Sequence, residues 1–241
     1  MNSTNKVIGF TLIMTVFVAV LLTGLREVTK EKAALNEEIF NKRAILMAVE
    51  KHLPDGKKVK DLTDGDVAGI FGSNIEQVGL NMAGEPVEGV LAEDIDMAKE
   101  RKKPEADRLL PLYVYTQGDQ KFYIISIRGN GLWDEIWGNI ALEGDLSTIT
   151  GAAFDHKGET PGLGAEIKDN PGFGTQFAGK SIYDEQGNYT SITVRKGGAK
   201  DPKHDVDGIS GATVTGDGVT EMLQRGIKYY EPYFAKLKSN I

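Results

Sequence analysis

Residues 207–215 read Asp-Gly-Ile-Ser-Gly-Ala-Thr-Val-Thr and run into a stretch, from about Asp217 to Tyr229, that predicts a helix near the end of the chain. A helix N-terminus presents unpaired N–H groups and a partial positive charge, so a phosphate placed there is stabilised. The hydroxyls of Ser210, Thr213 and Thr215 add donors for such an anion. The stretch therefore predicts a phosphate site, although glycine-rich turns that end in Ser or Thr caps also occur as purely structural features.

Three further glycine-marked segments precede this stretch: Gly129-Asn130-Gly131-Leu132-Trp133, Glu159-Thr160-Pro161-Gly162-Leu163-Gly164 and Lys196-Gly197-Gly198. The chain has 29 glycines, and 18 of them fall between Gly129 and Gly218. Each segment follows or lies near an expected strand, where glycine lets a loop approach a ligand closely and adopt positive φ. The segments predict loops able to wrap a flat apolar ring beside the phosphate.

The elements around these loops predict an α+β fold with packed helices on an antiparallel sheet. Aromatic and β-branched runs predict strands at Leu112–Tyr115, Lys121–Ile127, Ile136–Leu142, Ser147–Asp155 and Ser191–Lys196. The first two form a hairpin around Gln117-Gly118-Asp119. Apolar periodicity predicts helices at Arg26–Leu53, which Pro54-Asp55-Gly56 ends, and at Asp61–Phe71. Residues 95–105 are charged and are expected to be helical or loosely ordered.

The N-terminal region predicts a membrane anchor. Residues 7–25 are 19 consecutive residues without a charge, between Lys6 and Arg26, and a bilayer core needs roughly 20. The run is longer than a signal-peptide core and no A-x-A-like cleavage site follows it, which favours an uncleaved helix over a signal peptide. The expected organisation is a tail (1–6), a transmembrane helix (7–25), a helical stalk with the N-terminal part of the soluble region (26–110), and a ligand-binding domain (111–241).

Composition excludes several function classes. The chain has 241 residues, 40% hydrophobic and 26% charged, and its net charge of −7 argues against nucleic acid as a partner. It has no cysteine, which excludes disulfides, thiolate catalysis and Cys-ligated zinc or iron–sulfur clusters. Its three histidines lie far apart in sequence and predict no metal site.

Residues 207–213 fit the D-x-x-(S/T)-G-A-T pattern of flavinylation sites, in which a flavin transferase esterifies the last threonine with the phosphate of FMN. With G-N-G-L-W, G-E-T-P-G-L-G and K-G-G in this order behind one membrane helix, the chain resembles the C subunits of bacterial sodium-translocating NADH:quinone oxidoreductases. The G subunits of the related Rnf complexes share the FMN-binding domain and the S/T-G-A-T pattern.

The resemblance implies covalent FMN on Thr213 through a phosphoester, beside Ser210, Gly211 and Ala212. It places Thr160, Gly162, Leu163 and Gly164 against the isoalloxazine ring, Trp133 near the flavin, and Lys196 and Gly197 by the phosphate or ribityl chain. No residue needs to act as a catalytic acid or base, because the redox chemistry belongs to the flavin.

Other roles remain open for neighbouring residues. Trp133 either contacts flavin or packs with Trp137, Glu159 is expected to be a loop residue rather than a proton donor, and Thr215 is expected to cap the following helix.

The function that the resemblance implies is electron transfer in a membrane complex that passes electrons from NADH to ubiquinone and moves sodium. The implied partners are the other subunits, a flavin transferase and the lipid bilayer. The family places the FMN domain on the periplasmic side of the inner membrane, although Arg26, Lys30 and Lys32 after the span weakly favour the cytoplasm. The alternatives are the FMN subunit of an Rnf-type ferredoxin:NAD oxidoreductase and a non-redox, membrane-anchored ligand-binding module. The soluble part from about Leu35 onward is expected to fold without the anchor.

Overall fold

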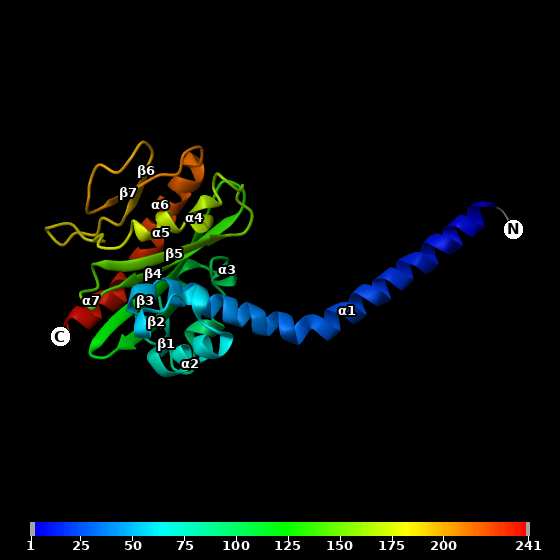
Figure 1. Cartoon of the computed structure of the whole chain (residues 1–241), viewed down its shortest axis with the longest axis horizontal. Helices are drawn as coiled ribbons and strands as arrows, with labels where there is room; N and C mark the ends of the chain where they lie inside the picture. Colours follow the sequence, from blue (N-terminus) through cyan, green and yellow to red (C-terminus); the bar gives the residue numbers. More distant parts are fainter. Residues whose placement is uncertain (1–2, 240–241) are drawn as a thin grey trace. The chain divides into compact units, whose positions relative to one another are not determined.

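A computed structural model describes residues 3–239, which fall into two units, a helical segment up to Asn41 and a compact unit from Lys42 onward (Figure 1). One helix, α1 (Ser3–Met47), contains both the expected membrane segment and most of the helix expected at Arg26–Leu53. An 18-residue stretch of α1 has a mean hydropathy of 2.4, which is long and apolar enough to cross a membrane. The α-helix ends at Met47, and a 3₁₀ turn, η1 (Glu50–His52), follows it.

The compact unit is built on an antiparallel sheet of five strands in the order β1-β2-β3-β4-β5. Their bounds are β1 (Ile75–Asn81), β2 (Leu109–Gln117), β3 (Gln120–Asn130), β4 (Glu135–Leu142) and β5 (Ile149–His156). The expected hairpin is confirmed: β2 and β3 pair up to Gln117 opposite Gln120, and Gly118 in the turn has φ 58°. The α+β fold with an antiparallel sheet is confirmed.

Side chains cover both faces of this sheet, because successive strand residues point to opposite sides. Leu112 and Val114 of β2 belong to one core, whereas Tyr113 and Tyr115 belong to the other. The first core includes residues of α4 (Glu166–Asp169), α5 (Pro171–Thr175), α6 (Thr213–Lys228) and α7 (Glu231–Ser239). The second includes the last residues of α1 and residues of α2 (Asp64–Asn74), the helix expected at Asp61–Phe71.

Helix α6 crosses the sheet at β3 and β4 (Figure 1). Glycine permits a close approach here: a Cβ added at Gly226 would lie 2.7 Å from Cγ2 of Ile127, and one at Gly129 would lie 2.6 Å from Cβ of Met222. A larger residue at either position would force the helix away from the sheet. The first turn of α6 is therefore placed by a long contact with the core.

Several elements lie outside the sequence predictions. Strand β1 was not expected because Ile75-Glu-Gln-Val-Gly-Leu-Asn81 has few apolar residues, and its Gly79 makes room for Val90. Since β1 pairs with β2, one sheet contains residues of both the region expected at 26–110 and the ligand-binding domain expected at 111–241. Only α3 (Met97–Glu100) is α-helical within the charged stretch at 95–105. The expected strand at Ser191–Lys196 is the short β6 (Thr193–Arg195), which pairs in parallel with β7 (Asp205–Asp207). The remaining 3₁₀ turns are η2 (Pro54–Gly56), η3 (Val59–Asp61), η4 (Ala92–Asp94) and η5 (Glu105–Asp107).

Candidate functional site

The site forms around the first turn of α6, which begins at Thr213 and not near Asp217 as expected. Its N-cap is Ala212, which has no side-chain oxygen, and the first turn contains no acidic residue. The N–H groups of this turn therefore have no side-chain cap, and the turn itself contains no acidic residue that would offset their partial positive charge. An anion on the Thr213 side chain would lie in this favourable field.

The loop at 159–164 meets this helix end through Leu163 and Gly211. Gly211 has φ 76°, and a Cβ added to it would lie 2.7 Å from Cδ2 of Leu163. A side chain at position 211 would thus suffer both backbone strain and a clash. On the other side of the contact, Gly162 has φ 74°, and the loop is closed by the N–H groups of Leu163 and Ala165, which both donate to the carbonyl of Thr160.

Glu159 joins three glycine-marked segments through one buried carboxylate, only 5% exposed. Its Oε1 accepts from the backbone N–H of Trp133 at 2.9 Å, and its Oε2 accepts from the hydroxyl of Thr215 at 2.7 Å. A Cβ at Gly131 or Gly164 would collide with the same carboxylate, so both positions need glycine to leave it room. Glu159 thus lies in a loop, as expected, and its buried carboxylate also anchors the site, a role that the sequence did not suggest.

Thr215 also differs from its expected role. It does not cap α6, because it lies inside the first turn and is fully buried. Its hydroxyl donates to Glu159, which fixes the helix end to the loop at 159–164. The sequence predicted a helix start about four residues too late, so it assigned the capping role to a residue that lies inside the first turn.

Exposed apolar side chains surround the same point. In residues 42–239, six large hydrophobic side chains are exposed, and four of them are Leu132, Trp133, Leu163 and Val214. The indole Nε1 of Trp133 donates to Oγ1 of Thr160 at 3.1 Å, which holds the ring over the 159–164 loop. Trp137 instead lies under the guanidinium of Arg128, and within the described residues no ring contact joins it to Trp133. An apolar surface beside an uncapped helix start fits a ligand that has a flat ring and a phosphate.

The segment Lys196-Gly197-Gly198 lies beside the beginning of the motif rather than at Thr213. Arg195 and Asp207 are paired across β6 and β7, and the N–H of Gly208 donates to the carbonyl of Arg195 at 2.8 Å. A carboxylate oxygen of Asp207 accepts from the N–H of Ala199 at 2.7 Å. Lys196 and Ser210 are exposed, so the structure leaves the side chains of both accessible to a ligand.

Comparisons with known proteins agree with this geometry. The family model of the FMN-binding domain matches residues 131–228, which include the loops at Trp133, Glu159 and Lys196 and the start of α6. The C subunit of the Na(+)-translocating NADH-quinone reductase of Pseudomonas aeruginosa is 32% identical over 98% of this chain and 97% of its own length. The C subunit of the Neisseria meningitidis reductase is 33% identical over 97% of this chain and 92% of its own length.

Solved structures give the same result. The C subunit of this reductase from Parabacteroides distasonis superposes with a TM-score of 0.73 at 33% identity, over 85% of this chain and 96% of that one. NqrC of Shewanella oneidensis superposes with a TM-score of 0.70 at 25% identity, over 86% of this chain and 99% of that one.

Proposed function

The chain belongs to the family of C subunits of the Na(+)-translocating NADH-quinone reductase, and we propose that it carries FMN on Thr213 and transfers electrons within that complex. The observation that carries the assignment of Thr213 is its place in the first turn of α6, where no side chain caps the helix and its N–H groups are left to bind an anion. Ser210, which lies before the helix, and Thr215, which is committed to Glu159, lack this combination.

The protein's part in the chemistry is to hold and surround the cofactor, which itself supplies the redox change. The N–H groups of Thr213 and its neighbours stabilise the phosphate charge. Leu163, Trp133 and Val214 offer apolar surface to the ring and exclude water from part of it. Glu159 bonds to the backbone of Trp133 and to the side chain of Thr215. The loop that carries Trp133 and the first turn of α6 therefore keep their separation when the cofactor's charge changes. Lys196 supplies a positive charge near the start of the motif.

Attachment of FMN is tested by the intact mass of the native protein. A phosphoester on Thr213 adds the mass of FMN less one water, and the denatured protein band remains fluorescent because the bond is covalent. A native mass equal to the sequence mass, measured after expression with an active flavin transferase, would contradict the proposal. Attachment requires this transferase as a maturation partner, so omitting it should leave the protein colourless.

We further propose that α1 anchors the protein in the cell membrane of a bacterium, with the FMN domain on the periplasmic side. The length and hydropathy of α1 support the anchor. The excess of basic residues after the span is only about two, which is too weak an orienting bias to outweigh the family's arrangement. A reporter that is active only outside the cytoplasm, fused after Ile241, should be active. Activity of a cytoplasm-only reporter at the same position would overturn the orientation and leave the FMN assignment intact.

A further inference from the structure

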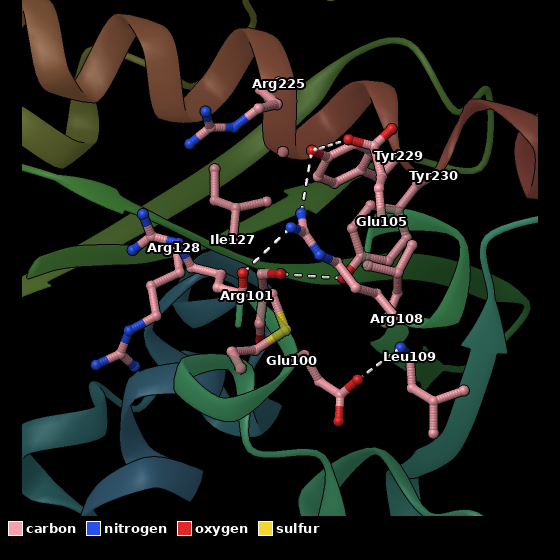
Figure 2. A pocket seen from close by; sticks show the side chains of 14 residues that line it. Glu100, Arg101, Glu105, Arg108, Leu109, Ile127, Arg128, Arg225, Tyr229 and Tyr230 are labelled. Atoms are coloured by element: carbon pink, nitrogen blue, oxygen red, sulfur yellow. Dashed lines mark hydrogen bonds between the residues drawn. The ribbon is translucent and has the colours of Figure 1, made fainter. Parts of the chain in front are cut away.

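A pocket with a cavity volume of about 290 Å³ lies at the C-terminal end of α6, away from Thr213. It is enclosed by α3 and η5, by the middle of β3 and by the C-terminal turns of α6. Figure 2 shows its charged lining residues, which are Glu100, Arg101, Glu105, Arg108, Arg128 and Arg225, together with Tyr229. None of these residues belongs to the loops that surround Thr213.

The lining is unusually rich in arginine. The chain has seven arginines and a net charge of −7, yet four of the seven line this one pocket. Two glutamates, Glu100 and Glu105, also line it. Glu100 is paired with Lys103 at 2.8 Å, and Glu105 accepts from the hydroxyl of Tyr229 at 3.1 Å. The pocket therefore gathers positive charge in a protein whose overall charge is negative.

Arg108 has only uncharged acceptors among the described residues. Its guanidinium donates to the carbonyls of Lys103 and Arg101 and, at 3.4 Å, to the hydroxyl of Tyr229. Figure 2 shows two of these bonds, which point the guanidinium between Arg101 and Tyr229. A half-buried guanidinium without a carboxylate keeps its full charge to offer to an incoming anion.

The other three arginines have carboxylate partners, and two of them share one. Glu135 alone serves both Arg101 and Arg128, at 3.4 and 2.8 Å. Arg225 is paired with Glu221 at 3.0 Å on the surface of α6. Burial lowers the pKa of Arg101, Glu135 opposes this, and the charges of Arg225, Arg128 and Arg108 lower the pKa further. The guanidinium groups thus repel one another across the pocket, and an anion between them would relieve that repulsion.

We propose that this pocket binds a doubly charged phosphate group of a small molecule. Guanidinium groups bind phosphate oxygens through paired N–H donors, and tyrosine hydroxyls add single donors. The cavity approaches the lower end of the size range of small-molecule sites, which favours a small ligand over a protein segment. The site is separate from that of FMN, since Thr213 and Arg225 are 12 positions apart, or roughly 18 Å along α6.

The pocket nevertheless contacts the loop that carries Trp133. Arg101 donates to the carbonyl of Gly129 at 3.1 Å and to Oδ1 of Asn130 at 3.1 Å. These are the first two residues of the G-N-G-L-W segment. An anion that draws Arg101 toward the cavity would pull on that segment. Binding in the pocket can therefore be followed by tryptophan fluorescence as well as by heat, with Trp137 beside the pocket residue Arg128 contributing to the signal together with Trp133.

The test uses the full chain with its FMN, in a neutral detergent, titrated with inorganic pyrophosphate in a calorimeter. Sodium chloride at matched ionic strength controls for screening. We expect saturable one-to-one binding, weakened at least about 10-fold in Arg225→Gln and Arg108→Gln, because a hydrogen bond to a charged group contributes about 1.5–3 kcal/mol. Lys60→Gln, which removes one positive charge from an exposed position outside the pocket, should bind as the unmodified chain does.

A second arm distinguishes the source of the phosphate. The same variants are titrated with a soluble short-chain phosphatidic acid. Binding of this lipid alone, lost in Arg225→Gln and kept in Lys60→Gln, supports the phosphate site and assigns it to a lipid headgroup. If neither probe binds saturably, or if all four proteins bind equally, the arginines form only an internal ionic network and the proposal is wrong.

Discussion

The two ends of α6 favour anions by opposite means. At Thr213 the helix start offers main-chain N–H groups and the positive end of the helix dipole, and glycines in the surrounding loops leave room for a single buried carboxylate, that of Glu159. At Arg225 the dipole is negative and repels an anion, and arginine side chains supply the positive charge. The first site depends on backbone geometry, whereas the second depends on side-chain charge.

This difference predicts different sensitivities. Apart from the buried carboxylate of Glu159, a backbone site tolerates changes of charge but not of volume, because Gly131 and Gly164 leave room for Glu159 and Gly211 leaves room for Leu163. A side-chain site on a helix surface tolerates changes of volume but not of charge. Substitutions at the two ends of α6 can separate these cases.

The largest effect is expected at the attachment residue. Thr213→Val should abolish covalent FMN completely, because the hydroxyl that forms the phosphoester is gone while the β-branched shape is kept. Thr213 is partly exposed and makes no side-chain hydrogen bond among the described residues, so the domain should remain folded. In-gel flavin fluorescence and intact mass measure the loss.

Ser210→Ala and Thr215→Val are the matched controls for this experiment, and both should keep covalent FMN. Thr215→Val should also lower the free energy of unfolding by about 1–3 kcal/mol, because it leaves one oxygen of buried Glu159 without a donor. FMN found on Ser210 or Thr215 by peptide mapping would overturn the assignment of Thr213.

The next effect concerns the buried carboxylate. Glu159→Gln replaces one acceptor oxygen with an NH₂ group that faces either the N–H of Trp133 or the hydroxyl of Thr215. The amide can still accept from the N–H of Trp133 and donate to the hydroxyl of Thr215, but both bonds lose their charge assistance, which should lower the free energy of unfolding by about 2 kcal/mol. Denaturant unfolding monitored by tryptophan fluorescence measures it. Glu88→Gln, at an exposed position, is the control, and an equal effect there would show that Glu159 has no special role.

The sequence predicted the sheet well and the helix start poorly. The strands from β2 to β5 have dense β-branched and aromatic runs, so local pattern was sufficient for them. Strand β1 has no such pattern and is held by pairing with β2 and by the fit of Gly79 to Val90, which are tertiary features. Helix α6 begins at Thr213, four residues before the expected start. Its first turn, Thr-Val-Thr-Gly, has low helix propensity, so the sequence did not predict it, and the bond from Thr215 to Glu159 stabilises it instead.

At the candidate site, too, local sequence pattern could not predict the tertiary contacts. The sequence identified four segments, the motif and three glycine-marked loops, and the structure brings those at Trp133, Glu159 and Thr213 together. What the sequence did not reveal is that Glu159 links them, because its partners are 26 and 56 residues away. The glycines at 131 and 164 were visible, but the side chain for which they leave room was not. The arginine pocket was likewise missed, since its arginines come from separate elements.

A smaller effect should separate two glycines in one loop. Gly164→Ala places a methyl group against Oε2 of Glu159 and Oγ1 of Thr215, and overpacking of this kind costs about 1–3 kcal/mol. Gly162→Ala meets no atom within 4 Å but must adopt φ 74°, which costs about 1 kcal/mol. Denaturant midpoints should therefore fall further for Gly164→Ala. The reverse order would show that backbone strain, not volume, limits this end of α6.

The smallest effect on stability is expected at the other end of the helix. Arg225 is exposed, and its pair with Glu221 is an i,i+4 contact on the helix surface, which contributes only about 0.3–0.5 kcal/mol. Removing its charge also relieves the repulsion that Arg225 exerts on Arg101, which offsets part of that loss. Arg225→Gln should thus leave the denaturant midpoint almost unchanged in low salt, and in high salt the difference should vanish because the charges are screened. A loss above about 1 kcal/mol would mean that the arginines hold the C-terminal end of α6 together. The contrast between a backbone site and a side-chain site would then fail, because both ends would be structural.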